Sequence, residues 1–233
     1  FSPGITWPRR TSRLSFRFLP KGCVFGDKSP VIQPIDGNLD SLRSLIGYLN
    51  TPSFTETLNL MVGSSELAQS FEVGIVKSCP LPQGDPERQA LLAGEIYMRL
   101  YRRDSINEGS HAFLSCCAPI GIRDSLTNSH RDLQTFHFRE ERELLEKQSE
   151  LDRIGATALN FQVLNSQLSH QDFDELSLAE YASGILSFGL GAVFGRWDIR
   201  YATGERMAPE LPDPFAPLPV CPPGMLQNGE GLP

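Results

Sequence analysis

The stretch LQTFHFREERELLEKQSELDRIGATAL, residues 133 to 159, predicts one long helix. Leu144, Leu151 and Ala158 recur every seven residues, and Gln148 and Ile154 fill in the stripe that they form. Charged residues surround this stripe, so one face of the helix is suited to burial and the rest to solvent. We therefore expect this helix to be one arm of an antiparallel helix pair.

The candidate partner is a helix that starts at Asp85-Pro86-Glu87. A carboxylate is a good helix cap, proline is favoured at the first helical position, and an acid in the first turn complements the helix dipole. We expect this helix to run to about Arg103. Its apolar residues at four-residue spacing are Leu92, Ile96 and Leu100.

A further helix is expected from Ser177 to about Gly195. Its start, Ser177-Leu178-Ala179-Glu180, has the sequence of a capping box. Gly184, Gly191 and Gly195 make such a helix costly in isolation. We therefore expect it to pack closely against other elements.

The first eighty residues predict short strands and two short helices. In the stretch LSFRFL, residues 14–19, alternation places Leu14, Phe16 and Phe18 on one face and Arg17 on the other. Further strands are expected at residues 22–25, 31–35 and 71–76. Two helices are expected from their period, the first capped by Asp40 and the second starting at Ser53.

These elements predict an α+β protein. Short N-terminal strands with a basic face would be followed by a mainly helical region that contains the long antiparallel helix pair. We divide the chain into segments 1–83, 84–207 and 208–233. The last segment holds eight of the eighteen prolines, so we expect an extended or disordered tail without a core of its own.

The charge of the chain is unevenly distributed. The net charge over 233 residues is −7, yet residues 1–35 carry six basic residues against one acid, Asp27, which leaves −12 for the rest. Guanidinium groups match phosphates and the guanine edge, and a β ribbon can enter a major groove. The segment is a candidate DNA-contact surface, and the alternative is a solvated strand face with ordinary salt bridges. The candidate DNA-binding residues are Arg9, Arg10, Arg13, Arg17, Lys21 and Lys28.

No catalytic, cofactor or metal site is predicted. His111 and Cys116 are five residues apart, which fixes no geometry for a base and a nucleophile, and a buried structural cysteine is favoured. The five cysteines lack the spacing of a zinc site and suit a reducing cytoplasm. The longest apolar run, near residues 185–194, is about half of a membrane span. We expect neither a secretory signal nor a membrane segment.

Several motifs occur in a characteristic order. They are PGITWPRRT at residues 3–11, LPKGCVFGDK at 19–28, FEVGIV at 71–76, SHAF at 110–113 and FGRWDIR at 194–200. This series resembles the downstream, non-catalytic half of large bacterial adenine-specific DNA methyltransferases, namely the PglX-like proteins of BREX phage-defence systems and the fused restriction-modification enzymes of type IIG.

The resemblance implies a function in target recognition. In that family the S-adenosylmethionine site and the Asn-Pro-Pro-Tyr/Phe motif lie upstream, and this chain contains no Asn-Pro dipeptide. The fragment is thus expected to be inactive alone. Residues 1–83 would recognise double-stranded DNA, and residues 84–207 would be a helical spacer or scaffold. The implied partners are DNA, the upstream methyltransferase domain and other defence-system subunits in a bacterial cytoplasm.

The rival hypothesis is a non-catalytic protein-interaction module of a multi-subunit complex. In it, the acidic helices and the proline-rich tail dock partner subunits, and the N-terminal arginines bind an acidic patch of the same protein. Arg196, Asp198 and Arg200 are expected to form a structural ion-pair cluster that closes the glycine-rich helix, and DNA contact is the alternative for them. The DNA hypothesis predicts that Arg9→Ala with Arg10→Ala weakens duplex binding and flattens its salt dependence by about 0.9 in log–log slope per lost phosphate contact.

Overall fold

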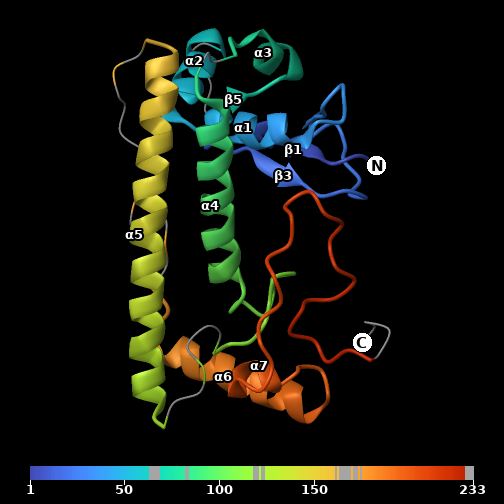
Figure 1. Ribbon diagram of the computed structural model, residues 1–233, viewed down its shortest axis with the longest axis vertical. Helices are drawn as coiled ribbons and strands as arrows, with labels where there is room; N and C mark the ends of the chain where they lie inside the picture. Colours follow the sequence, from blue (N-terminus) through green and yellow to red (C-terminus); the bar gives the residue numbers. More distant parts are fainter. Residues whose placement is uncertain are drawn as a thin grey trace. The chain divides into compact units, whose positions relative to one another are not determined.

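The fold is α+β, with short antiparallel strands near the N-terminus and a mainly helical remainder (Figure 1). It is described from a computed structural model. Two compact units emerge from the residue contacts: unit 1 holds residues 1–97, 145–169 and 213–217, and unit 2 holds the rest. The described residues are 1–62, 69–81, 84–117, 121, 124–160, 162, 169, 173 and 175–228. The sequence-based division at 83 and 207 follows chain order rather than packing, and it stays a prediction.

A small antiparallel sheet forms one side of unit 1. Its order is β3-β1-β4, with β1 at Gly4–Thr6, β3 at Arg17–Leu19 and β4 at Val31–Ile32. Ile5 pairs with Phe18 and Ile32 across the sheet, is fully buried, and joins the core of the unit. The predicted alternation in residues 14–19 is confirmed, because Leu14 and Phe16 are buried whereas Arg17 is exposed.

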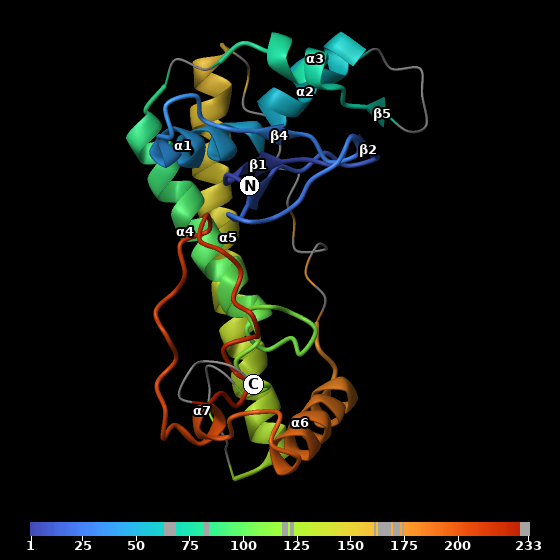
Figure 2. The same cartoon turned by 90° about the vertical axis from the view of Figure 1, so that its right-hand side faces the viewer.

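A second pair of strands joins distant parts of unit 1 (Figure 2). Strand β2, Arg10–Thr11, pairs with β5, Gln69–Ser70, in antiparallel register. The strand predicted at residues 22–25 is wrong, since this stretch forms a turn followed by irregular chain. Gly22 begins it in the left-handed region, at φ 89°, a conformation that suits a turn and not a strand.

Two helices complete the core of unit 1. Helix α1, Leu39–Leu49, and helix α2, Pro52–Val62, appear where the period predicts them. The cap of α1 is Asn38 rather than Asp40, because the Asn38 side chain accepts the Asp40 backbone N–H at 3.0 Å. The core residues of this unit include Leu42, Ile46, Phe54 and Leu58.

The strand predicted at residues 71–76 is wrong. Residues Val73–Ser78 form helix α3, and strand β5 ends before it, at Ser70. Glu72 occupies the N-cap position with an extended backbone, and its carbonyl accepts the Val76 N–H at 3.1 Å. A short apolar run has no period that separates a buried strand from a helix turn, which explains the error.

The predicted antiparallel helix pair is present. Helix α4, Pro86–Asp104, and helix α5, Leu126–Ala158, contribute to both units. In unit 1, Arg88 pairs with Glu150 and Glu95 with Lys147, so residue numbers rise on one helix as they fall on the other. Helix α5 starts seven residues earlier than predicted. The Ser125 hydroxyl accepts the Asn128 N–H there, a capping signal that the sequence interpretation overlooked.

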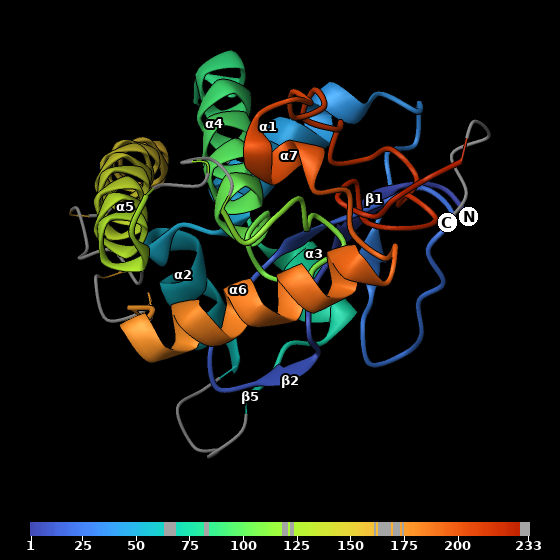
Figure 3. The same ribbon diagram turned by 90° about the horizontal axis from the view of Figure 1, so that it is seen from below.

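Helix α6, Leu178–Val193, belongs to unit 2 together with the short helix α7, Arg200–Thr203 (Figure 3). The predicted capping box at Ser177 and Glu180 is confirmed on both sides. Close packing is confirmed at Gly191, where an added Cβ would lie 2.6 Å from the Trp197 Nε1 atom. The prediction of close packing is wrong at Gly184, where an added Cβ would meet no atom within 4 Å.

The proline-rich segment is irregular chain with turns where it is described, and parts of it are buried. Phe215 is 2% exposed in the core of unit 1, where its ring packs edge-on against Phe18. In unit 2, the Gly224 N–H donates to the Phe113 carbonyl, and Met225 pairs with Trp197 in an isolated bridge. The expectation of a tail without a core therefore needs correction: its residues complete the cores of both units. Residues 229–233 lie outside the described residues.

Candidate nucleic-acid interface

Arg9 is held in place by acids. Its Nε lies 3.1 Å from Glu72 Oε1 and its Nη1 lies 3.8 Å from Asp27 Oδ2. Its backbone N–H donates to the Lys28 carbonyl at 3.0 Å, and its carbonyl accepts the Phe71 N–H at 2.7 Å. Arg9 therefore links the start of β2 to the turn at Asp27 and Lys28 and to the chain at Phe71 and Glu72. The two carboxylates already largely compensate its charge.

Arg10 and Lys28 lie next to the contacts that Arg9 makes. Arg10 lies on β2 opposite Ser70, and the turn that carries Lys28 is joined to β2 through the Arg9 N–H. Both side chains are exposed. Among the residues that the structure describes, neither has a carboxylate within ion-pair distance.

Arg17 and Lys21 lie along the edge strand of the three-stranded sheet. Arg17 pairs in register with Thr6, and paired residues of an antiparallel sheet share a face, so Arg17 lies opposite the Ile5–Phe18 face that enters the core. Lys21 follows in a turn whose backbone is fixed by a 3.0 Å bond from its N–H to the Phe215 carbonyl. Neither side chain has an acidic partner within the described part of the chain.

Arg13 is exposed in the loop between β2 and β3. Its backbone is tied to Thr11, whose hydroxyl accepts the Arg13 N–H at 3.1 Å and donates to the Arg13 carbonyl at 2.8 Å. The predicted set thus divides by environment. Arg9, Arg10 and Lys28 are joined by backbone contacts at one place in unit 1, and Arg17 and Lys21 lie on a second strand and its turn.

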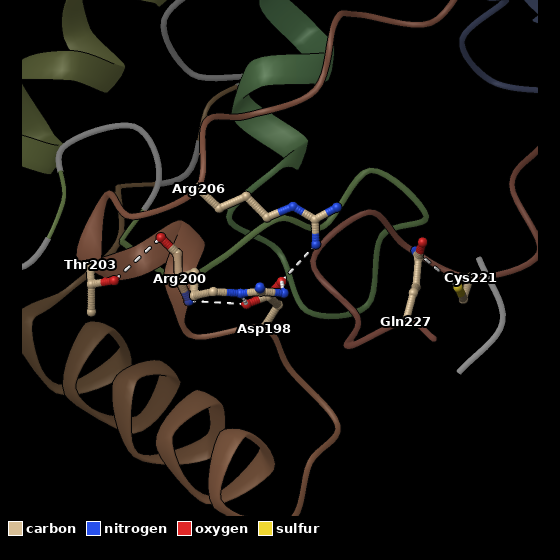
Figure 4. Close-up of polar contacts among 6 residues, drawn as sticks. All are labelled: Asp198, Arg200, Thr203, Arg206, Cys221 and Gln227. Atoms are coloured by element: carbon tan, nitrogen blue, oxygen red, sulfur yellow. Dashed lines mark hydrogen bonds and ion pairs between the residues drawn. The ribbon is translucent and has the colours of Figure 1, made fainter. Parts of the chain in front are cut away.

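A separate polar cluster in unit 2 is built on Asp198 (Figure 4). This carboxylate, 2% exposed, accepts two hydrogen bonds of 2.7 Å from the Arg200 guanidinium and one of 2.7 Å from Arg206. These bonds, the one from Arg200 above all, hold the pKa of the Asp198 carboxyl well below its usual range despite burial. The predicted structural ion-pair cluster is therefore confirmed for Asp198 and Arg200.

The composition of that cluster differs from the prediction. Arg196 is outside it: its guanidinium stacks over the Trp197 ring at 4.4 Å and lies 3.7 Å from Glu108. Arg206 takes its place, and sequence reasoning missed it because it follows α7 in irregular chain with no periodic signal. The cluster also ties unit 2 together, since the Asp198 N–H donates to the Gly224 carbonyl at 2.8 Å.

Cys116 is buried, as expected, and the described contacts of His111 do not include it. Cys116 Sγ faces Cys117 Sγ at 3.6 Å, and both thiols are buried. Their mutual hydrogen bond raises the pKa of the Cys116 thiol and lowers the pKa of the Cys117 thiol. The His111 ring instead packs edge-on against Tyr101. Within the described ranges, no three histidine, cysteine or acidic side chains gather as metal ligands would.

No protein-family model and no curated protein matches this sequence. Among the described helices, none combines the length and the apolar character needed to cross a membrane. The candidate interface therefore consists of the basic residues in unit 1.

Proposed function

We propose that this chain is the DNA-recognition and scaffold portion of a site-specific adenine-specific DNA methyltransferase of the restriction-modification or BREX phage-defence type, in a bacterial cytoplasm. Methyl transfer and S-adenosylmethionine belong to the upstream half of such a parent protein. This sequence contains no Asn-Pro-Pro motif, so no methyl-transfer step is assigned to its residues.

The observation that carries the proposal is the set of uncompensated cations in unit 1. Arg10, Arg17, Lys21 and Lys28 are exposed, and none has a carboxylate partner among the described residues, in a chain of net charge −7. These four cations lie within 19 residues of sequence, before β4, and they remain available to a partner. This concentration of positive charge, unpaired among the described residues, favours an external polyanion such as the DNA backbone.

Backbone contacts order both places in unit 1 that carry these cations. Backbone hydrogen bonds fix the segments that carry Lys21, Lys28 and Arg10, so their charges are presented from ordered chain. A preorganised surface loses less conformational freedom on binding than a disordered basic tail. Helices α4 and α5 would act as the spacer that the resemblance implies.

The proposal is tested by fluorescence anisotropy with a labelled DNA duplex. Replacement of Arg10, Arg17, Lys21 and Lys28 by alanine is expected to weaken binding far more than Arg9→Ala, because Arg9 is already paired. Lys77→Ala is the matched control, since Lys77 is an exposed lysine of unit 1 outside the set. Equal effects of the fourfold variant and of Lys77→Ala would refute the assignment.

The alternative function, a protein-interaction module, is favoured by one observation on α6. Leu186, Leu190, Val193 and Phe194 are 61% to 84% exposed and share one side of the end of this helix. Exposed apolar patches of this kind mark contact surfaces. Under this alternative, wild-type protein would bind neither heparin nor duplex DNA, whereas Leu190→Glu would abolish capture of a partner subunit.

A further inference from the structure

Unit 2 contains a cavity that the proposed DNA contact does not use. Its volume is about 820 Å³, and its described walls come from the end of α4, the chain between α4 and α5, the first half of α5, α7 and the chain that follows α7. All of the described residues that line the cavity belong to unit 2. Ligand pockets in proteins typically measure about 300–1,000 Å³, so the cavity has the size for one small molecule.

Three aromatic rings line the cavity, those of Tyr101, Phe136 and Tyr201. Phe136 is buried and the two tyrosines are half-buried. Burial raises the pKa of both tyrosine hydroxyls, so the rings remain neutral at physiological pH. Neutral aromatic side chains in a cavity stack well on a planar aromatic ligand.

The charge of the lining is positive. Arg102 and Arg139 both contribute, and neither has an acidic partner in the described part of the chain. The carboxylate in the lining, Glu140, is 3% exposed and is bound by Arg99 at 3.0 Å. Arg139 lies over the Phe136 ring at 5.8 Å, which places a cation beside an aromatic wall. Guanidinium groups bind phosphate oxygens with two parallel hydrogen bonds.

One wall of the cavity is preorganised by the Asp198 cluster. Helix α7 supplies Tyr201 and Thr203 to the cavity, and Asp198 fixes its first residue, Arg200, through two hydrogen bonds (Figure 4). Arg206, just after this wall, is bound to the same carboxylate. A wall held in this way needs little ordering when a ligand enters.

We propose that this cavity binds a small planar aromatic phosphate of the nucleoside monophosphate class. The aromatic rings hold the base, and Arg102 and Arg139 hold the phosphate. The site is distinct from the basic residues of unit 1.

Isothermal titration of the full chain with AMP, adenosine and inorganic phosphate tests the proposal. AMP is expected to bind at least about tenfold more tightly than adenosine or phosphate alone, because only AMP engages both the rings and the arginines. Arg102→Glu with Arg139→Glu is expected to lower AMP affinity by at least about tenfold. Arg131→Glu is the control, because Arg131 is exposed on α5, the helix that carries Arg139, and does not line the cavity.

A second measurement needs no variant. Phenylglyoxal modifies accessible arginines, and AMP is expected to slow modification of Arg102 and Arg139 but not of Arg131, as read by peptide mass spectrometry. The fourfold alanine variant of unit 1 is expected to keep AMP binding. Absence of AMP binding at millimolar concentration, or equal protection of all three arginines, overturns the proposal and leaves the DNA assignment of unit 1 standing.

Discussion

Replacing Gly191 by alanine tests how α6 packs. Alanine in a helix interior is more favourable than glycine by about 1 kcal/mol, so the change stabilises the helix itself. The new Cβ, however, would overlap the Cδ1 atom of Trp197 and lie 2.6 Å from its Nε1 atom. Trp197 is 2% exposed and packs edge-on against Phe113 at 4.7 Å, so its ring has little room to move.

The expected cost follows from these two opposing terms. Overpacking a filled core costs typically about 1–3 kcal/mol, and a clash with a buried ring belongs at the upper end. After the gain in helix propensity, Gly191→Ala is expected to lower the free energy of unfolding by about 2 kcal/mol. At about 2–4 °C per kcal/mol for a chain of this size, the melting temperature falls by about 4–8 °C.

Gly184→Ala supplies the matched control in the same helix. A Cβ at Gly184 meets no atom within 4 Å, so only the propensity gain of about 1 kcal/mol remains. Urea unfolding, followed by far-UV circular dichroism and tryptophan fluorescence, measures both variants. The two variants are expected to change the free energy of unfolding with opposite signs. If Gly191→Ala stabilises the protein as much as Gly184→Ala does, the packing of Trp197 on α6 is refuted.

Three further predictions concern unit 2. Asp198→Asn is expected to lower the free energy of unfolding at neutral pH. Folding lowers the pKa of the Asp198 carboxyl, so its contribution to stability is present above the unfolded pKa of about 3.9 and is lost as the pH falls below that value. The difference in stability between Asp198→Asn and wild type should therefore shrink in unfolding curves recorded at acid pH. Leu144→Ala, at a fully buried position, should cost about 2–5 kcal/mol in urea unfolding, whereas Leu186→Ala at an exposed position should change stability by less than about 0.5 kcal/mol, and equal losses would contradict the burial pattern. Burial lowers the pKa of His137 to about 4, so its ring should titrate near that pH by NMR. The stability contributed by the neutral ring should be lost as the pH falls from the unfolded pKa of about 6.5. A titration midpoint near 6.5 would show instead that the ring is solvated.

Local signals predicted the helical part of the fold well. The Asp85 cap, the period of α5 and the Ser177 capping box each depend on residues close together in sequence, and each is present. Residues 71–76 were misassigned because a six-residue apolar run carries no decisive period. The structure resolves it through contacts that the local sequence does not contain, including the bond from the Phe71 N–H to the Arg9 carbonyl.

The candidate sites show a similar limit. Composition identified the basic N-terminal segment, but not that Glu72 and Asp27 bind Arg9 and leave Arg10 without an acidic partner within the described residues. The cavity of unit 2 was missed altogether. Its arginines lie on α4 and α5, whereas Tyr201 comes from α7, and only the folded chain brings these elements to one cavity.

The salt dependence of duplex binding by the wild-type chain tests the central claim most directly. Each phosphate contact contributes about −0.9 to the slope of log affinity against log salt concentration. Four available cations therefore predict a slope of about −3 to −4. The fourfold alanine variant should then show a slope near zero. Wild-type binding that is absent, or that does not respond to salt, would contradict DNA recognition by unit 1.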